Sequence, residues 1–332
     1  MTSSAFFYGK LPNFSDFVRH NASGAEVRAL DRWIQEGLYA AAHHFDRGWN
    51  EAYERTPAYR FVFSPDDSAH FLIGVLQPSR DRSERKYPFC VALTRGKNIY
   101  ESKSSPLVPM IFSSFFKESQ KIIQLGLQGF SLSDLAERVD CLEDALEENA
   151  SASQWSFKEY LSKTTQEKFW TGLFGDFDDP RKYLIIYNLL ELFQPNSPGT
   201  SRSLKIGIRF PLNSQGYSFI PEVCFWSQFC SSLLAEAPFH PHLFWTDQGR
   251  DGKDFLFLFL GKVQARSFIL FIDPDAENDS VCKLDDEGKE TLAWPDRGIP
   301  AKYREILEGK ESTLADVLRE FGRFLGKGED FY

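Results

Sequence analysis

Cysteine is scarce in this chain of 332 residues, and no two of its five cysteines have CxxC spacing. An odd, unclustered set is typical of free thiols in a reducing compartment rather than of a disulfide framework. Methionine is scarcer still, with 2 residues against 32 phenylalanines, so we expect a core of aromatic rings. The net charge of −9 argues against a surface that follows the phosphates of a nucleic acid.

Long uninterrupted apolar runs are also missing. The most apolar stretch, DFLFLFLGKVQARSFILFID (254–273), contains Lys262 and Arg266. Neither half approaches the roughly 20 residues that a membrane-spanning helix requires, and we expect two adjacent buried strands instead. The first residues, MTSSAFFYGK, show no basic segment followed by an apolar core, so no secretory signal is expected. These absences predict a cytoplasmic protein without membrane insertion.

Recognisable catalytic and metal motifs are absent. The sequence contains neither a GxSxG nucleophile elbow nor a Rossmann fingerprint. His43 and His44 are adjacent, so on a helix they point about 100° apart and cannot share an ion. His240 and His242 would share one side of a strand, but no cysteine or carboxylate is close to them, which is typical of partly exposed histidines. We therefore expect no enzyme, no metal and no cofactor.

The stretch FYGKLPNFSDFVRH (7–20) sets a glycine, a lysine and a proline close together. A phosphate-binding loop requires G-x-x-x-x-G-K-[ST] leading directly into a helix. Here Gly9 is the single glycine, Lys10 precedes leucine, and Pro12 removes an amide that such a loop would use. We interpret GKLP as the exit from a strand.

A second notable stretch is GVLQPSRDRSERKYPFCVA (74–92), in which a charged loop separates two strand-like runs. Its charges are compatible with a solvated hairpin loop. Alternatively, Arg82 and Arg85 form ion pairs with Asp16 or Asp81, or meet an acidic group on a partner, since guanidinium presents a planar fork of donors. We hypothesise that Asp16 meets Arg82 or Arg85 and so ties the N-terminal segment to the sheet.

Hydrophobic periodicity predicts an alternation of strands and helices. The first long helix starts at Ser23, with Glu26 in capping-box register, and its apolar face is formed by Val27, Leu30, Trp33, Ile34, Leu38 and Ala41. The predicted strands cover 6–12, 59–63, 70–76, 87–93, 203–212, 242–247, 254–260 and 267–273. The other predicted helices cover 106–127, 131–148, 155–161, 183–193, 222–234 and 312–325.

The two halves of the chain share one order of elements: a strand, a helix with a tryptophan, three strands and a helix. Strands with short connections favour antiparallel pairing, and flanking helices cover such a sheet. We predict an α+β fold of two similar α/β-layered units, each with a mainly antiparallel sheet covered by helices, joined by a helical segment. The predicted domains are 1–150 and 151–332, with a boundary that could lie nearer 150–165 and a flexible loop at 194–203.

Taken together, the two stretches and the first helix resemble the type VI secretion-associated TagF family. That family has GKLPxxGDFVxR, a helix with W-x-x-x-G-L, and then GVLxPSxDRxGRxFPL. The resemblance covers roughly residues 7–92 and is weaker toward the C-terminus. The matching residues are Gly9, Lys10, Leu11, Pro12, Asp16, Phe17 and Val18, then Trp33, Gly37 and Leu38, then Gly74, Val75, Pro78, Ser79, Asp81, Arg82, Arg85 and Pro88.

This chain departs from the family pattern at several positions. Ser15 and Glu84 stand where glycine is usual, and Arg19 comes one position early. Tyr87 and Phe89 flank the proline of the second block, where Phe and Leu are usual. The loss of two glycines predicts altered backbone geometry in both loops.

The resemblance implies a bacterial cytoplasmic, non-enzymatic regulator. Such a protein would be a post-translational repressor of the type VI secretion system that binds a forkhead-associated scaffold component. Two alternatives are an unrecognised enzyme with a cleft around Asp16, Asp81 and Arg82, and a structural subunit of the machine. The residues expected to form a partner-binding or structural motif are Gly9, Lys10, Pro12, Asp16, Arg19, Trp33, Pro78, Ser79, Asp81, Arg82 and Arg85.

Overall fold

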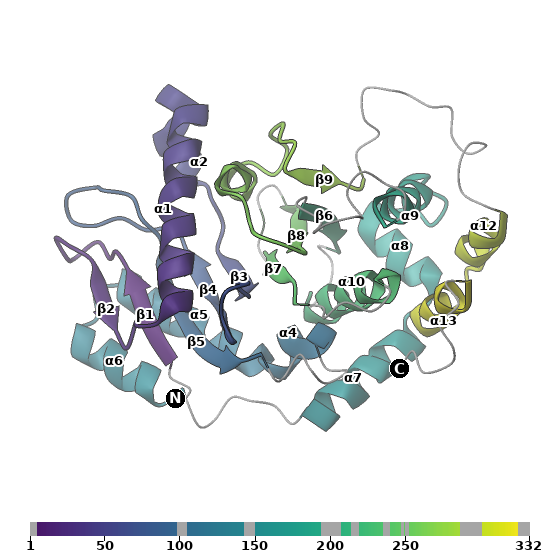
Figure 1. Ribbon diagram of the computed structural model, residues 1–332, viewed down its shortest axis with the longest axis horizontal. Helices are drawn as coiled ribbons and strands as arrows, with labels where there is room; N and C mark the ends of the chain where they lie inside the picture. The colour runs from purple at the N-terminus through teal and green to yellow at the C-terminus, as the bar shows by residue number, and fades with distance from the viewer. Residues whose placement is uncertain are drawn as a thin grey trace.

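The centre of the structure is one large β-sheet, seen in the computed structural model of Figure 1. The described residues are 5–97, 105–142, 150–193, 207–213, 219–234, 240–246, 249, 252–285 and 301–324. Within them the strand order is β2-β1-β5-β4-β3-β7-β8-β6-β9. The strands are β1 (Ala5–Gly9), β2 (Val18–His20), β3 (Tyr59–Phe63), β4 (His70–Gln77), β5 (Phe89–Gly96), β6 (Gly207–Leu212), β7 (His242–Trp245), β8 (Asp254–Phe259) and β9 (Val281–Lys283).

Neighbouring strands of the sheet are antiparallel, apart from the parallel pair β6 and β9. The predicted α+β class with a mainly antiparallel sheet is confirmed. The strands of the two halves do not form two separate sheets, however, because β3 pairs with β7 and places Phe61 opposite Phe244. An edge strand carries unpaired backbone groups, and this pairing satisfies an edge of each half. The domain boundary near residue 150 stays a prediction.

Helices cover both faces of the sheet. They are α1 (Ala25–Phe45), α2 (Trp49–Glu54), α4 (Val108–Ile111), α5 (Ser113–Leu127), α6 (Leu132–Asp140), α7 (Ala150–Lys163), α8 (Gln166–Phe174), α9 (Arg181–Leu192), α10 (Ile220–Leu233), α11 (Phe268–Ile272), α12 (Ala301–Glu308) and α13 (Leu314–Phe324), with 3₁₀ turns η1 (Asp46–Gly48), η2 (Ser105–Leu107) and η4 (Ala265–Ser267). In Figure 1, α8, α9, α10, α12 and α13 gather beside the C-terminal strands. Among the described residues, no helix is both long and apolar enough to cross a membrane.

Each face of the sheet has its own hydrophobic core. Successive side chains of a strand point to opposite faces. Accordingly, Phe6 and Phe61 belong to the core under α1, whereas Phe7 and Val62 belong to the core on the other face. The first core also contains α11, and the second contains residues of α5, α7 and α10. The expected aromatic core is confirmed in that the largest fully buried side chains are all aromatic, packed among aliphatic residues.

Helix α1 buries the predicted apolar face, but it begins later than expected. Its N-cap is Gly24, which makes no side-chain cap, and not Ser23. The Glu26 carboxylate does not complete a capping box, because it accepts a hydrogen bond from Ser68 Oγ and lies 3.4 Å from His70 Nδ1. The first turn of the helix is therefore fastened by the turn before β4.

The predicted strand at 267–273 is wrong, because this segment forms η4 and α11. Its run of apolar residues is buried throughout, and such a run looks the same in a buried strand and in a buried helix. The predicted helix at 106–127 is interrupted at Phe112, between α4 and α5. The expected loop at 194–203 and the predicted helical residues 143–148 lie outside the described residues.

Helix α1 also joins the two halves of the chain. The Trp33 ring packs 5.0 Å from the ring of Phe244, 5.3 Å from that of Phe268 and 5.4 Å from that of Phe271, between ring centroids. One turn further on, a Cβ added to Gly37 would lie 2.5 Å from the Cβ of Phe268. The W-x-x-x-G pattern is thus explained by a close helix contact between α1 and α11, with Trp33 buried as a core residue.

Replacing Gly37 by alanine tests this contact. Alanine normally favours a helix over glycine by about 1 kcal/mol, but here the added methyl group overlaps Phe268. We expect Gly37→Ala to lower the free energy of unfolding by about 1–3 kcal/mol, as overpacking does, when measured by urea denaturation. The matched control is Gly48→Ala, where the added Cβ would have no atom within 4 Å. Equal stability of the two variants would show that α11 moves away from α1 without cost.

Candidate functional site

The two sequence blocks meet in space at the exit of β1. The backbone of Gly9 has a φ of 136°, and a Cβ there would lie 2.1 Å from the carbonyl oxygen of Pro88. Glycine is required because the chain passes directly against the start of β5, in a conformation that side chains disfavour. The interpretation of GKLP as a strand exit is confirmed.

Asp81 holds the two blocks together. Its side chain is buried, with the residue 1% exposed, and it lies between β4 and β5. Asp81 Oδ2 accepts hydrogen bonds from Lys10 Nζ at 3.0 Å and from Arg85 Nε at 2.8 Å. Asp81 Oδ1 accepts the backbone N–H groups of Ser83 at 2.9 Å and of Arg85 at 3.0 Å. These four bonds use the acceptor capacity of a carboxylate.

The buried carboxylate stays ionised. Burial raises the pKa of Asp81, but hydrogen bonds from Lys10 and from the amides of Arg85 and Ser83, with the charge of Lys10, outweigh burial and lower the pKa to about 2. Lys10 is itself only 6% exposed, and its ammonium group lies 5.1 Å from the ring centroid of Phe17. Lys10 and Asp81 therefore form a buried, charged link between the strand exit and the 79–87 loop.

The proposed pairing of Asp16 with Arg82 or Arg85 is wrong. Asp16 is exposed, and its carboxylate accepts the N–H of the following residue at 2.8 Å. Arg82 Nη2 donates instead to the carbonyl of Asn13 at 2.6 Å, and Arg85 Nη2 to that of Ser15 at 2.5 Å. The two arginines do tie the N-terminal segment to the sheet, but through backbone carbonyls, which lie nearer than the Asp16 side chain.

Other residues of the predicted motif have structural or surface positions. The buried Tyr53 hydroxyl donates to the Ser79 carbonyl at 3.0 Å and accepts the Ser79 N–H at 3.2 Å. Pro12 and Pro78 line a groove of about 370 Å³ beside this bond. Arg19 is exposed on β2, opposite Tyr8. Among the described residues, no group of three metal-ligating side chains could hold an ion.

Phe17 was matched to the family pattern but was left out of the residues expected to form the motif. Phe17 is 40% exposed and packs on Tyr8 at 5.5 Å and on Tyr87 at 4.8 Å, between ring centroids. The hydroxyls of Tyr8 and Tyr87 both donate to Asp31 of α1, at 3.2 and 2.6 Å. The available signal was its place in the DFV segment of the family pattern, directly after Asp16.

Glu84 stands where the family pattern has glycine, and its backbone conformation is one that glycine favours. Its φ is 65°, in the left-handed region that favours glycine. Its carboxylate lies 2.8 Å from Arg80 Nη1, and both side chains are largely exposed. The loop of this chain thus keeps a backbone suited to glycine while carrying a side chain.

Replacing the buried carboxylate should be far more damaging than replacing the exposed one. We expect Asp81→Asn to lower the free energy of unfolding by about 3–5 kcal/mol, because it leaves Lys10 charged and buried without its partner. The matched change Asp16→Asn keeps an oxygen for the neighbouring N–H and should stay within about 0.5 kcal/mol of wild type. Urea denaturation at neutral pH measures both. Equal effects of the two changes would contradict the central position of Asp81.

The Lys10–Asp81 ion pair also predicts that the free energy of unfolding depends on pH. Because the pKa of Asp81 is lowered on folding to about 2, its contribution to stability is complete above about pH 4 and is lost as the pH falls toward 2. In the Asp81→Asn variant, the free energy of unfolding should therefore change less than in wild type as the pH falls from about 4 toward 2. In a double-mutant cycle, the variant that carries both Asp81→Asn and Lys10→Met should lose less free energy of unfolding than the two single variants lose in sum. Additive losses would show that the two side chains do not interact.

Glycine at position 84 should stabilise the loop. We expect Glu84→Gly to raise the free energy of unfolding by about 1 kcal/mol, because it removes the cost of a side chain in the left-handed region, and the exposed pair with Arg80 offsets little of this gain. The control Glu84→Ala loses the same ion pair and keeps the strained backbone, so it should not be stabilised. Thermal unfolding compares the two. A Glu84→Gly variant less stable than Glu84→Ala would contradict this account.

Part of this chain is similar to a known protein family. Among solved structures, the crystal structure of PA0076 from Pseudomonas aeruginosa PAO1 is similar, with 16% sequence identity and a TM-score of 0.48 over 90% of this chain and 100% of that chain. No curated protein matches this chain. Residues 6–142 match the family described as the TagF N-terminal domain, Type VI secretion system-associated, and both blocks of the site lie within this match.

Proposed function

We propose that this protein is a non-enzymatic accessory regulator of a bacterial type VI secretion system. It acts in the cytoplasm as a post-translational repressor, by binding a forkhead-associated scaffold component and holding back assembly of the machine. The observation that carries the accessory role is the match of residues 6–142 to the TagF N-terminal domain. The resemblance of the two sequence blocks to TagF supports the proposal of repression and of a scaffold partner.

The geometry of the site divides its residues between a framework and a surface. Lys10 and Asp81 are buried against each other and form the framework. Asp16, Phe17 and Arg19 lie on the outside of the same segment. We call these three exposed residues the docking turn and propose that it contacts the scaffold protein, because aromatic and arginine side chains supply much of the binding energy in protein interfaces.

The hydrogen bonds of the Asp81 carboxylate support a binding protein rather than an enzyme. A general base needs a lone pair within reach of a substrate proton, whereas both Asp81 oxygens already accept two hydrogen bonds each. Arg82, the cation of the alternative enzyme site, is bound to the carbonyl of Asn13. A structural subunit would differ from a repressor in remaining with the assembled machine, so the timing of release separates those two functions.

Secretion assays test the regulatory role. We expect deletion of the gene to raise type VI secretion and extra copies to suppress it, measured as the amount of secreted effector in culture supernatants. A strain that carries the docking-turn variant Phe17→Ala/Arg19→Glu at normal protein level should behave like the deletion. Unchanged secretion in both the deletion and the overexpressing strain would refute the regulator.

Binding assays test the docking turn itself. The purified forkhead-associated protein of the same bacterium should bind the wild-type chain, and Phe17→Ala/Arg19→Glu should weaken binding at least about tenfold, as the loss of a central contact does. The control Lys158→Glu changes charge at an exposed position on α7 and should bind normally. If the docking variant binds as tightly as this control, contact is made elsewhere.

A further inference from the structure

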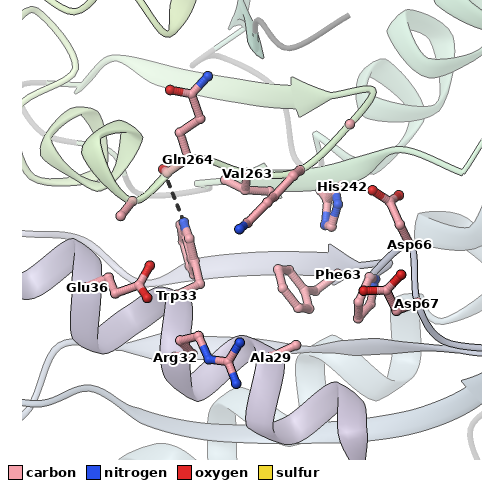
Figure 2. Close-up of a pocket in the computed structure, with 14 residues that line it drawn as sticks. Ala29, Arg32, Trp33, Glu36, Phe63, Asp66, Asp67, His242, Val263 and Gln264 are labelled. Carbon is pink, nitrogen blue, oxygen red and sulfur yellow. Dashed lines mark hydrogen bonds between the residues drawn. The ribbon is translucent and has the colours of Figure 1, made fainter. Parts of the chain in front are cut away.

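A second cavity lies where the two halves of the sheet join, away from the TagF motif residues of the loops. It encloses about 580 Å³ and is shown in Figure 2. Its walls come from α1, from the turn after β3, from β7 and from the 261–265 segment. The Trp33 indole N–H donates to the Gln264 carbonyl at 3.4 Å and so fastens that segment to α1. Its volume is in the range of cavities that hold small molecules.

The cavity contains a buried histidine with an unused donor. The sequence predicted a partly exposed His242, but the residue is 3% exposed on β7 and its ring lies 4.8 Å from that of Phe63. Its Nδ1 accepts the backbone N–H of Ser64 at 3.1 Å, so the proton of the neutral ring is on Nε2. In the part of the chain that the structure describes, no residue accepts a hydrogen bond from Nε2. His242 lines the cavity, so this N–H group is a donor for a molecule bound there.

The histidine remains neutral at physiological pH. Burial lowers the pKa of His242 to about 3, and the charge of Lys97 acts in the same direction. A neutral imidazole with Nδ1 occupied presents a single N–H donor at Nε2. This donor fits a ring nitrogen or carbonyl oxygen of an uncharged molecule.

The residues that line the cavity indicate further chemical features of a molecule that would bind there. Trp33 and Phe63 are each 5% exposed, with ring centroids 6.3 Å apart, and form an apolar wall of the cavity. An aromatic wall suits a planar ring. Around them stand three exposed carboxylates and two exposed cations, namely Glu36, Asp66, Asp67, Arg32 and Lys262. Carboxylates accept hydrogen bonds from hydroxyl groups, and their excess over the cations disfavours a phosphate.

We propose that this cavity binds an uncharged nucleoside-like molecule, a planar heteroaromatic ring that carries hydroxyl groups. The ring packs against Trp33 and Phe63 and accepts a hydrogen bond from His242 Nε2. The hydroxyl groups donate to the carboxylates of Asp66 and Asp67 at the rim. This site is independent of the docking turn and of the proposed role in secretion.

Titration calorimetry with the full chain tests the proposal, with adenosine, guanosine, cytidine and uridine as probes. At least one nucleoside should bind saturably, and its 5′-monophosphate should bind more weakly. Ala29→Phe fills the cavity from the surface of α1 without removing a hydrogen bond, and it should weaken binding at least tenfold. Arg28→Phe, at an exposed position on the same helix that does not line the cavity, is the matched control and should bind like wild type.

His242→Phe keeps the ring and removes the donor, so it should weaken nucleoside binding by about 2- to 12-fold, the equivalent of one neutral hydrogen bond. Thermal unfolding checks that this variant is folded; if it is not, Ala29→Phe decides the outcome. No saturable binding of any of the four nucleosides to the wild-type chain overturns the proposal. Binding that survives Ala29→Phe, or tighter binding of the monophosphate, overturns it as well.

Discussion

The antiparallel contact between β3 and β7 is the interaction on which the rest of the structure depends. Three residue pairs are enough to make one sheet from the strands of both halves. The contact is short, but it is backed by Trp33, which packs from α1 onto aromatic rings of β7 and α11. The backbone pairing of β3 with β7 and the packing of Trp33 hold the two halves together at the same place. As a result, α1 covers strands of both halves. The cavity lies beside this helix.

The TagF motif residues serve two physical purposes. Gly9 is constrained by the close approach of the backbone at Pro88, and Asp81 is constrained by burial. Together they fix the geometry where the exit of β1 meets the 79–87 loop. Phe17 and Arg19 are held outward by that corner and are available for contact. A buried ion pair is weak evidence for net stability but constrains geometry strongly once formed. In the proposed function, the buried Lys10–Asp81 pair would position the docking turn without itself contacting a partner.

Much of the local structure was predictable because its signal is local. The apolar face of α1, the strands β3, β4 and β8, and the Ser131 cap of α6 each follow from residue spacing or from a capping side chain. The candidate site was predicted only in part. Asp16 and Asp81 are both carboxylates in polar loops near basic residues, so their sequence contexts are equivalent. Burial distinguishes them, and burial depends on which distant strand covers each loop.

By itself, the sequence determined the order of strands and helices across most of the chain, the aromatic character of the core, and the similarity of residues 6–142 to the TagF N-terminal domain. The tertiary structure decided that residues 268–272 form a helix, that β3 joins β7, and that Asp81 pairs with Lys10. It also placed a neutral His242 inside a cavity. The physical reason is range: periodicity and capping act within a few residues, whereas strand partners and buried charges are chosen by contacts between segments far apart in the chain.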